Sequence, residues 1–277
     1  MSSVYLHRYA GPVRALVTDL AGTVVDHGSS APAGAFVELF RRRGVAVTPA
    51  QAREPMGLEK KDHIRVLAAM PAVAARWEEA HGGAACSEED IEALYQMFVP
   101  LQLDVLPRYS ALIPGVREAV DALRERGVRI AANTGYNRRM METVLQAAAA
   151  QGFVPDAAVC ASDVAGGRPA PWMIFRSLEM LGVYPPEAAV KIGDTVPDIE
   201  DGLNAGVWTI GVTRTGNLLG LSEAEVEALA PEERGTRLAS ARRRLLQAGA
   251  HFVVESFADC VAVVEEIDQR LLRHERP

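Results

Sequence analysis

The sequence has few cysteines and no long uncharged apolar run. Its three cysteines, Cys86, Cys160 and Cys260, are widely spaced and form no CxxC pair. This pattern argues against a disulfide framework or a zinc site and favours a reducing compartment. The apolar runs fall far short of the ~20 residues that a membrane span needs, and the N-terminal residues lack the apolar segment of a signal peptide. We therefore expect a cytoplasmic protein with no membrane partner.

The sequence also lacks a basic excess and contains very little lysine. Its 29 basic residues stand against 36 acidic ones, a net charge of −7, which argues against a nucleic-acid partner. Only three of the 29 are lysines, Lys60, Lys61 and Lys191, and the others are arginines. These lysines are retained either by chance or because an amine is needed. A buried lysine can lose its proton and become a nucleophile, whereas arginine stays protonated.

The pattern of apolar segments predicts a mainly parallel, Rossmann-like α/β core. Most of the 277 residues alternate between buried-strand and helix patterns, which is typical of a parallel sheet with helices on both faces. Ligands in such folds bind beyond the carboxyl ends of the strands. Strands are expected at 13–18, 128–133, 157–160, 189–193, 208–212 and 252–254, and helices at 116–126, 138–151, 172–181, 199–204 and 257–272.

The stretch from residue 28 to residue 107 interrupts this alternation. It contains several prolines but no clear strand, so we expect an all-helical cap domain inserted after the first strand. The α/β core then comprises residues 1–27 and 108–277. Residues 214–250 are interpreted as an excursion at the sheet edge. Helices in these two stretches are expected at 35–43, 60–69 and 88–98 and from near Ser222 and Pro231, and linkers near 28–32 and 106–109.

Polar residues gather at or after the ends of the predicted strands. Asp19 follows the first strand in the pattern DLAGT, and Thr134 lies in NTGY. Arg168 stands in GGRP, and Asp194 and Asp198 belong to GDTVPD. Glycine lets backbone amides approach an anion, a hydroxyl at a helix start suits a phosphate, and carboxylates suit Mg²⁺. Each pattern alone is also typical of a turn or a helix cap.

Together and in this order, the four patterns resemble the four sequence motifs of the haloacid dehalogenase superfamily. The resemblance covers nearly the whole chain, including the helical insert. It implies that Asp19 attacks phosphorus and that Thr134 and Arg168 bind the phosphoryl oxygens. It also implies a Mg²⁺ cofactor, whose ligands are Asp19, the main-chain carbonyl of Ala21 and Asp194, supported from nearby by Asp198.

Ala21 departs from the usual pattern of this superfamily. Its phosphatases carry DxD, in which the second aspartate protonates the leaving alcohol, and a methyl group cannot act as an acid. The leaving group must then be prepared in another way, or the chain is no phosphomonoesterase. Two functions therefore stay open as alternatives to the one that the insert suggests below. They are hydrolysis of a phosphomonoester by the same fold and phosphate binding without catalysis.

The pattern PMGLEKKDH in the insert offers another way to prepare the leaving group. A lysine amine condenses with an aldehyde to an iminium ion, which is an electron sink. Cleavage of a neighbouring carbon–phosphorus bond then releases a neutral enamine and not a carbanion. This segment and Ala21 together closely resemble the phosphonoacetaldehyde hydrolase family, the phosphonatases. The resemblance implies that Lys60 forms the Schiff base and that His63, on the same helix face, assists imine formation or proton transfer.

The implied activity is hydrolysis of the carbon–phosphorus bond of phosphonoacetaldehyde to acetaldehyde and phosphate, through the Schiff base and an aspartyl phosphate. This reaction belongs to the degradation of 2-aminoethylphosphonate. A homodimer formed through the cap is implied as well. We expect the charge of Lys61 and partial burial under the cap to lower the pKa of Lys60. The implied substrate-binding residues are Ser29, Met56, Gly57 and Tyr136.

Overall fold

The computed structural model describes residues 9–277, and its core is a sheet of six parallel strands. This confirms the predicted α/β fold with a mainly parallel sheet. The strands are β1 (Ala15–Thr18), β2 (Arg129–Thr134), β3 (Ala157–Cys160), β4 (Ala189–Gly193), β5 (Trp208–Val212) and β6 (Phe252–Val254), in the spatial order β3-β2-β1-β4-β5-β6.

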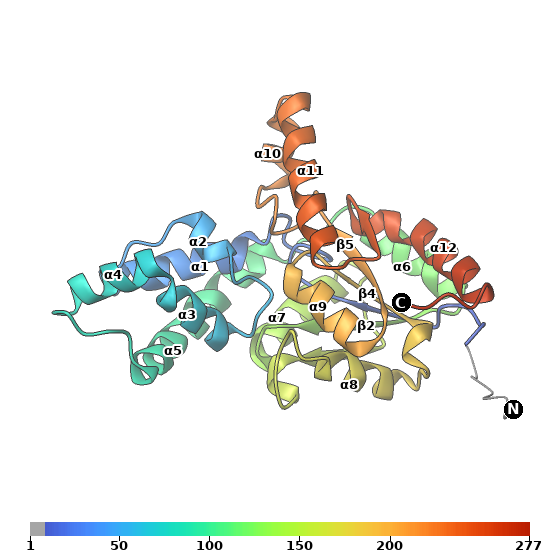
Figure 1. Ribbon diagram of the computed structural model, residues 1–277, viewed down its shortest axis with the longest axis horizontal. Helices are drawn as coiled ribbons and strands as arrows, with labels where there is room; N and C mark the ends of the chain where they lie inside the picture. Colours follow the sequence, from blue (N-terminus) through green and yellow to red (C-terminus); the bar gives the residue numbers. More distant parts are fainter. Residues whose placement is uncertain (1–8) are drawn as a thin grey trace, which may run out of the picture.

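Both faces of the sheet are buried. Successive side chains of each strand point to opposite sides, and apolar residues occupy both sides, as is usual in parallel sheets. Leu16 and Ile130 belong to one apolar cluster, and Ala15, Val17 and Ala131 belong to another. Helices therefore cover both faces, as Figure 1 shows. The first cluster includes residues of α6 (Val116–Glu125), α7 (Arg138–Ala149) and α12 (Cys260–Leu272), and the second includes residues of α8 (Trp172–Leu181) and α9 (Val196–Ala205).

The chain between β1 and α6 is helical and lies to one side of the sheet (Figure 1). The prediction named only three of its helices. The two it missed begin directly with Pro49 and Pro71, since proline suits the first turn of a helix. The helices are α1 (Ser30–Arg41), α2 (Pro49–Arg53), α3 (Lys60–Ala69), α4 (Pro71–Ala80) and α5 (Glu88–Val105), followed by a 3₁₀ helix (Leu106–Tyr109).

Two predicted boundaries in this segment were wrong. The helix α5 was expected to end at Phe98, but it continues through Pro100 to Val105. The helix α1 begins at Ser30, inside the stretch predicted as a linker. In both cases apolar packing outweighs the local signal, since Ala31 of α1 is buried in the same core against which Leu101 and Val105 of α5 pack.

An aromatic core holds α3 in place. The ring of Phe36 on α1 stacks on His63 of α3 at 3.7 Å and on Phe98 of α5 at 4.4 Å between centroids. Because α3 begins at Lys60, this packing fixes where the amine of that lysine can lie.

Residues 214–250 form the predicted excursion at the sheet edge, with α10 (Glu223–Ala228) and α11 (Pro231–Gln247). In Figure 1, α11 rises away from the rest of the molecule. Its buried residues are Ala241 and Leu245, and Leu245 packs with Ile199 of α9 and Val253 of β6. Within residues 9–277, no helix combines the length and the apolar character needed to cross a bilayer.

Candidate active site

The polar residues predicted at strand ends lie at one edge of the sheet. Asp19 follows β1, Thr134 ends β2 and Asp194 follows β4. These three strands are neighbours, and Thr18 of β1 pairs in register with Ala132 of β2 and Ile192 of β4. Parallel strands in register end together, so the side chains that follow them converge.

A tight turn after β1 presents Asp19. The backbone N–H of Asp19 donates to the carbonyl of Ile192 (3.0 Å), and that of Gly22 donates to Val25 (2.7 Å). Gly22 has a φ of +85°, and a Cβ there would lie 2.4 Å from Oδ2 of Asp194. Glycine is therefore required at this position for the turn to approach the second carboxylate.

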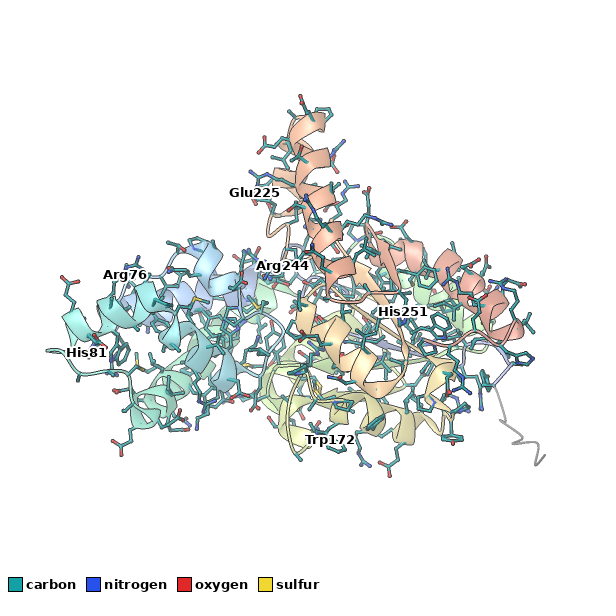
Figure 2. The ribbon with its side chains drawn as sticks, viewed as in Figure 1. Arg76, His81, Trp172, Glu225, Arg244 and His251 are labelled. Atoms are coloured by element: carbon teal, nitrogen blue, oxygen red, sulfur yellow. The ribbon has the colours of Figure 1, made fainter. Side chains whose placement is uncertain are left out.

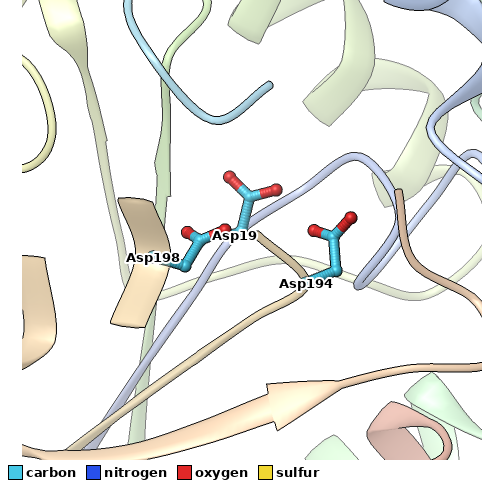
Figure 3. Close-up of side chains that lie close together, drawn as sticks. All are labelled: Asp19, Asp194 and Asp198. Atoms are coloured by element: carbon cyan, nitrogen blue, oxygen red, sulfur yellow. The ribbon is translucent and has the colours of Figure 1, made fainter. Parts of the chain in front are cut away.

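Three buried carboxylates meet at this edge (Figure 3). Asp19, Asp194 and Asp198 each offer an oxygen within 4.8 Å of the others. Burial, and then the charges of Asp19 and Asp198, raise the pKa of Asp194 well above its ordinary value. A divalent cation would relieve this repulsion, and oxygen donors of this kind suit Mg²⁺. The donor set thus fits a metal ion.

The main-chain carbonyl of Ala21 belongs to the same group of donors. The hydroxyl of Ser29 lies 3.0 Å from that carbonyl oxygen and 3.2 Å from Oδ2 of Asp194. Thr23 Oγ1 (3.1 Å) and the backbone N–H of Asn217 (2.7 Å) donate to the two oxygens of Asp194. Hydroxyl and amide donors thus orient Asp194, and within residues 9–277 it has no Lys or Arg partner.

Asp198 is already neutralised by the protein. Its Oδ1 lies 3.0 Å from Nη1 of Arg168 and 2.8 Å from Nζ of Lys191. Its Oδ2 accepts hydrogen bonds from the N–H and the hydroxyl of Thr195. Burial alone would raise the pKa of Asp198, but the charges of Arg168 and Lys191 outweigh burial and lower it. A cation is therefore drawn more strongly to Asp19 and Asp194.

Arg168 connects Asp19 to this network. Its Nη2 donates to Oδ1 of Asp19 (2.8 Å) and to Oδ1 of Asn133 (2.6 Å), and its Nε donates to Asp201 (3.2 Å). Burial raises the pKa of Asp19 and Arg168 opposes that rise, but the pKa stays above its ordinary value. Sequence reasoning assigned no role to Asn133, Asp201 or Lys191. Only the rarity of lysine singled out Lys191, whose Nζ donates to Asn133 (2.7 Å).

A small cavity lies above the carboxylates, between the sheet edge and the helical segment. Its volume is about 20 Å³, which is room for about one water molecule. All four predicted substrate-binding residues line it, whereas His63 does not. The lining residues are Asp19, Ala21, Ser29, Pro32, Met56, Gly57, Lys60, Thr134, Gly135, Tyr136, Arg168 and Thr195.

Lys60 is buried in the roof of this cavity, with 5% of its surface exposed. Its Nζ lies 4.9 Å from the centre of the Tyr136 ring and 5.7 Å from that of Phe36. Burial lowers the pKa of Lys60 to about 8, although Asp19 acts in the opposite direction. The contribution expected from Lys61 was wrong, because Lys61 points away and pairs with Glu92 at 2.6 Å.

His63 lies beside the aromatic core and outside the cavity lining. Its ring stacks on Phe36, and its Nε2 lies 3.0 Å from the carbonyl of Ala52. Burial, and then the charge of Lys60, lower its pKa well below the ordinary value, so the ring is neutral. His63 can therefore affect the amine of Lys60 only by fixing the position of α3.

Glycines mark where the helical segment crosses the core loops. Gly57 has a φ of +100°, and a Cβ there would lie 2.3 Å from Oγ1 of Thr195. A Cβ at Gly135 would lie 2.6 Å from the carbonyl oxygen of Leu58. Side chains at these positions would push the segment that carries Lys60 away from the carboxylates.

Comparisons with known proteins agree with this geometry. Residues 13–206 match the haloacid dehalogenase-like hydrolase family. A phosphonoacetaldehyde hydrolase from Nitratidesulfovibrio vulgaris is 47% identical over 97% of this chain and 96% of its own. One from Bacillus cereus is 44% identical over 94% and 98%.

Solved structures extend the comparison. The crystal structure of a phosphonoacetaldehyde hydrolase-like protein from Oleispira antarctica matches with a TM-score of 0.98 at 42% identity over the whole of both chains. A β-phosphoglucomutase from Clostridium difficile matches with a TM-score of 0.65 at 15% identity, over 94% of this chain and 99% of its own. This second likeness shows the fold alone.

Proposed function

The chain belongs to the haloacid dehalogenase-like hydrolase family, among its phosphonoacetaldehyde hydrolases, and from this premise we propose how its residues cleave phosphonoacetaldehyde into acetaldehyde and phosphate. The observation that carries the proposal is the cavity shared by Asp19, Ala21 and Lys60. A buried amine of lowered pKa faces a carboxylate, and no acid stands at position 21 to protonate an alcohol.

The amine of Lys60 begins the reaction. Its neutral form adds to the aldehyde carbon, and loss of water gives an imine. The imine nitrogen, once protonated, can accept the electron pair of the carbon–phosphorus bond. The lowered pKa of Lys60 increases the fraction of neutral amine available for the first step.

Asp19 then forms the bond to phosphorus. One of its oxygens attacks, the carbon–phosphorus bond breaks, and the electron pair moves into the enamine on Lys60. Water hydrolyses the resulting aspartyl phosphate to phosphate and free Asp19. The enamine takes a proton on carbon, and a second water releases acetaldehyde and the Lys60 amine. The leaving group therefore needs no acid at Ala21.

The remaining residues of the site support these steps. We propose that Arg168 orients Asp19 through their hydrogen bond and that Thr134 and Arg168 bind phosphoryl oxygens. Asp19, Asp194 and the Ala21 carbonyl would hold Mg²⁺, with Asp198 fixed beside them. A bound Mg²⁺ supplies positive charge that stabilises the phosphoryl oxygens.

Residues 28–107 act as a cap over a core of residues 1–27 and 108–277 in this proposal. The cavity of about 20 Å³ is too small for the substrate, so the cap must open for the substrate to bind and close again for the reaction. Closure brings Lys60 to Asp19 and excludes water. Ser29, Met56, Gly57 and Tyr136 then surround the aldehyde, and His63 keeps α3 in place.

The test measures phosphate release from phosphonoacetaldehyde beside a simple phosphate monoester. We expect release from the phosphonate alone. Borohydride added with substrate should reduce the imine and leave a two-carbon label on the peptide that contains Lys60. Asp19→Asn, which removes the nucleophile at constant size, should abolish phosphate release. Release from the monoester without any label on lysine would support the phosphomonoesterase alternative.

We also propose a homodimer formed through the cap and a location in the cytoplasm. Support for the dimer is the family likeness, together with Val66 on α3, which is 43% exposed. Support for the location is that Cys86, Cys160 and Cys260 are all free thiols. Light scattering should give twice the chain mass of 29.8 kDa, and a mass of one chain would contradict the dimer.

A further inference from the structure

The loop that follows β5 contacts the cap at Arg53. This arginine is the last residue of α2. Its Nη1 donates to Oδ1 of Asn217 (3.1 Å), and Nδ2 of Asn217 donates back to the carbonyl of Arg53 (3.0 Å). The two residues thus form a reciprocal pair, one bond between side chains and one to the main chain of Arg53, that joins the cap to the core across 164 residues of sequence.

The same arginine holds the connection between the core and α1. Its Nη1 lies 2.5 Å from the carbonyl oxygen of Gly28 and 3.3 Å from that of Ser29. The loop after β5 also binds this connection, because the N–H of Gly28 donates to the carbonyl of Thr215 (2.7 Å). Gly220 packs against the guanidinium so closely that a Cβ would lie 2.8 Å from Nε of Arg53.

Asn217 also reaches the carboxylate cluster. Its backbone N–H donates to Oδ2 of Asp194 (2.7 Å), and the Ser29 hydroxyl lies 3.2 Å from the same oxygen. One short loop therefore contacts the cap, the connection between the two parts of the chain and a proposed metal ligand. The segment with Met56, Gly57 and Lys60 follows Arg53 directly.

We infer that Arg53 and Asn217 form a latch that holds the cap closed, positioning Lys60 over Asp19 while keeping Asp194 oriented. Both are positioning residues, since neither lines the cavity. The inference rests on the proposed function for its catalytic meaning, but the latch itself is a property of the protein without substrate. It also gives residues 213–222 a role that the sequence did not indicate.

Two other contacts supply matched controls. Arg244 of α11 pairs with Glu54 of the cap at 2.6 Å, but both side chains are about half exposed, so solvent screens the pair. Figure 2 shows Arg244 at the base of α11, beside the cap, and Arg76 on α4 of the cap, far from Arg244. Arg76 donates to the carbonyl of Ala46 (2.7 Å) inside the cap, so its loss leaves the junction intact.

Hydrogen exchange on the full-length protein without substrate tests the latch. Arg53→Ala should speed exchange at residues 26–30 and 54–60 by about tenfold or more, because local opening becomes easier. Asn217→Ala should do the same to a smaller extent, because Arg53 keeps its bonds to Gly28 and Ser29. Arg244→Ala and Arg76→Ala should leave both segments unchanged.

Non-additivity separates a latch from two independent structural contacts. In the double variant, exchange should be faster than in Arg53→Ala but slower than the product of the two single effects, since the bond between Nη1 and Oδ1 is already lost and only the bond from Nδ2 of Asn217 to the carbonyl of residue 53 is removed further. Multiplied effects of the two changes, or equal effects in Arg76→Ala, would overturn the latch. If Arg53→Ala does not fold, Arg53→Lys replaces it. Hydrogen exchange in Arg53→Lys should then be faster than in the unmodified protein and slower than in the double variant Arg53→Lys with Asn217→Ala.

Steady-state kinetics then link the latch to the reaction. We expect kcat/KM for phosphonoacetaldehyde to fall about tenfold or more in Arg53→Ala, because fewer complexes close, and to change little in Arg244→Ala. Faster exchange with unchanged kcat/KM would refute the positioning role. If the unmodified protein releases no phosphate, the proposed function fails, while the exchange data still decide whether the latch exists.

Discussion

At the scale of single residues, Lys60 shows how burial creates a reactive group. An ordinary lysine has a pKa of ~10.4, so about one amine in 2,500 is neutral at pH 7. The pKa of Lys60 is about 8, so about one in ten is neutral. Its neighbour Lys61, partly exposed and paired with Glu92, keeps its proton because the hydrogen bond to Glu92 raises its pKa.

Replacing each of the two lysines by arginine should therefore have opposite outcomes. Lys60→Arg keeps a charge but cannot form an imine, so we expect near-background phosphate release and no borohydride label. Lys61→Arg should keep substantial activity. In the unmodified protein, kcat/KM should rise about tenfold per pH unit until about pH 8, as the amine deprotonates. A label on Lys61 or Lys191 would reassign the amine.

Gly57 tests how closely the cap must approach the core. Gly57→Ala should lower kcat/KM about tenfold or more, because its Cβ would meet Thr195 Oγ1 at 2.3 Å and a displacement of ~1 Å can cost ~10²-fold. Gly83→Ala is the matched control, with a similar positive φ of +88° but nothing within 4 Å of a Cβ. Equal activity losses in both variants would assign the effect to backbone strain.

At the scale of elements, the start of α1 depends on a carboxylate outside the helix. Both oxygens of Asp26 accept hydrogen bonds at 3.0 Å, from the N–H groups of Ser30 and Ala31. These are N–H groups that a helix cannot satisfy by itself. The helix carries Ser29 at its N-terminal boundary. The hydrogen bonds of Asp26 therefore also place the Ser29 hydroxyl, which contacts Ala21 and Asp194.

Asp26→Ala should lower the free energy of unfolding by about 0.5–2 kcal/mol, the usual effect of losing an N-cap, and should lower activity as well. Urea denaturation and phosphate release measure the two effects. Ser87→Ala is the control, because Ser87 caps α5 in the same way at an exposed site away from the cavity. We expect it to lower stability without lowering kcat/KM, and a similar loss of kcat/KM would contradict the role of α1.

At the scale of the whole molecule, we expect the buried carboxylates to make stability depend on pH and on metal. Burial raises the pKa of Asp26 and of Asp201 to about 7 and raises those of Asp19 and Asp194 as well. A raised pKa means that the folded state binds the proton more tightly than the unfolded state does. The resulting stability is full below the unfolded pKa of ~3.9 and is lost as pH rises through the folded value.

Without metal, the contribution of these buried carboxyls to the free energy of unfolding should therefore fall as pH rises from about 4 to about 7, while His63, whose pKa is lowered, acts in the opposite direction. Mg²⁺ should restore stability, by about 2.7 kcal/mol at a free concentration 100 times its dissociation constant. Calorimetry with and without Mg²⁺ measures the increase in Tm. Asp194→Asn should raise Tm in chelator and abolish the increment from Mg²⁺. A full increment in that variant would exclude Asp194 as a ligand.

The sequence by itself determined the order of the strands, most of the helices and the chemistry at the strand ends. Apolar periodicity depends on near neighbours in the chain, and so do the patterns around Asp19, Thr134 and Asp194. In a parallel sheet, residues that follow neighbouring strands must meet at one edge. These rules were enough for the α/β fold and the family resemblance, which the comparisons confirm.

Only the tertiary structure decided which of these groups are buried and which charges they meet. The low pKa of Lys60, the placement of His63 outside the cavity and the contacts of Arg168 with three carboxylates depend on segments far apart in the chain. Arg168 and Gly57 are 111 residues apart, and Arg53 and Asn217 are 164 apart. Desolvation and charge pairing act through space, so no local pattern of residues contains them.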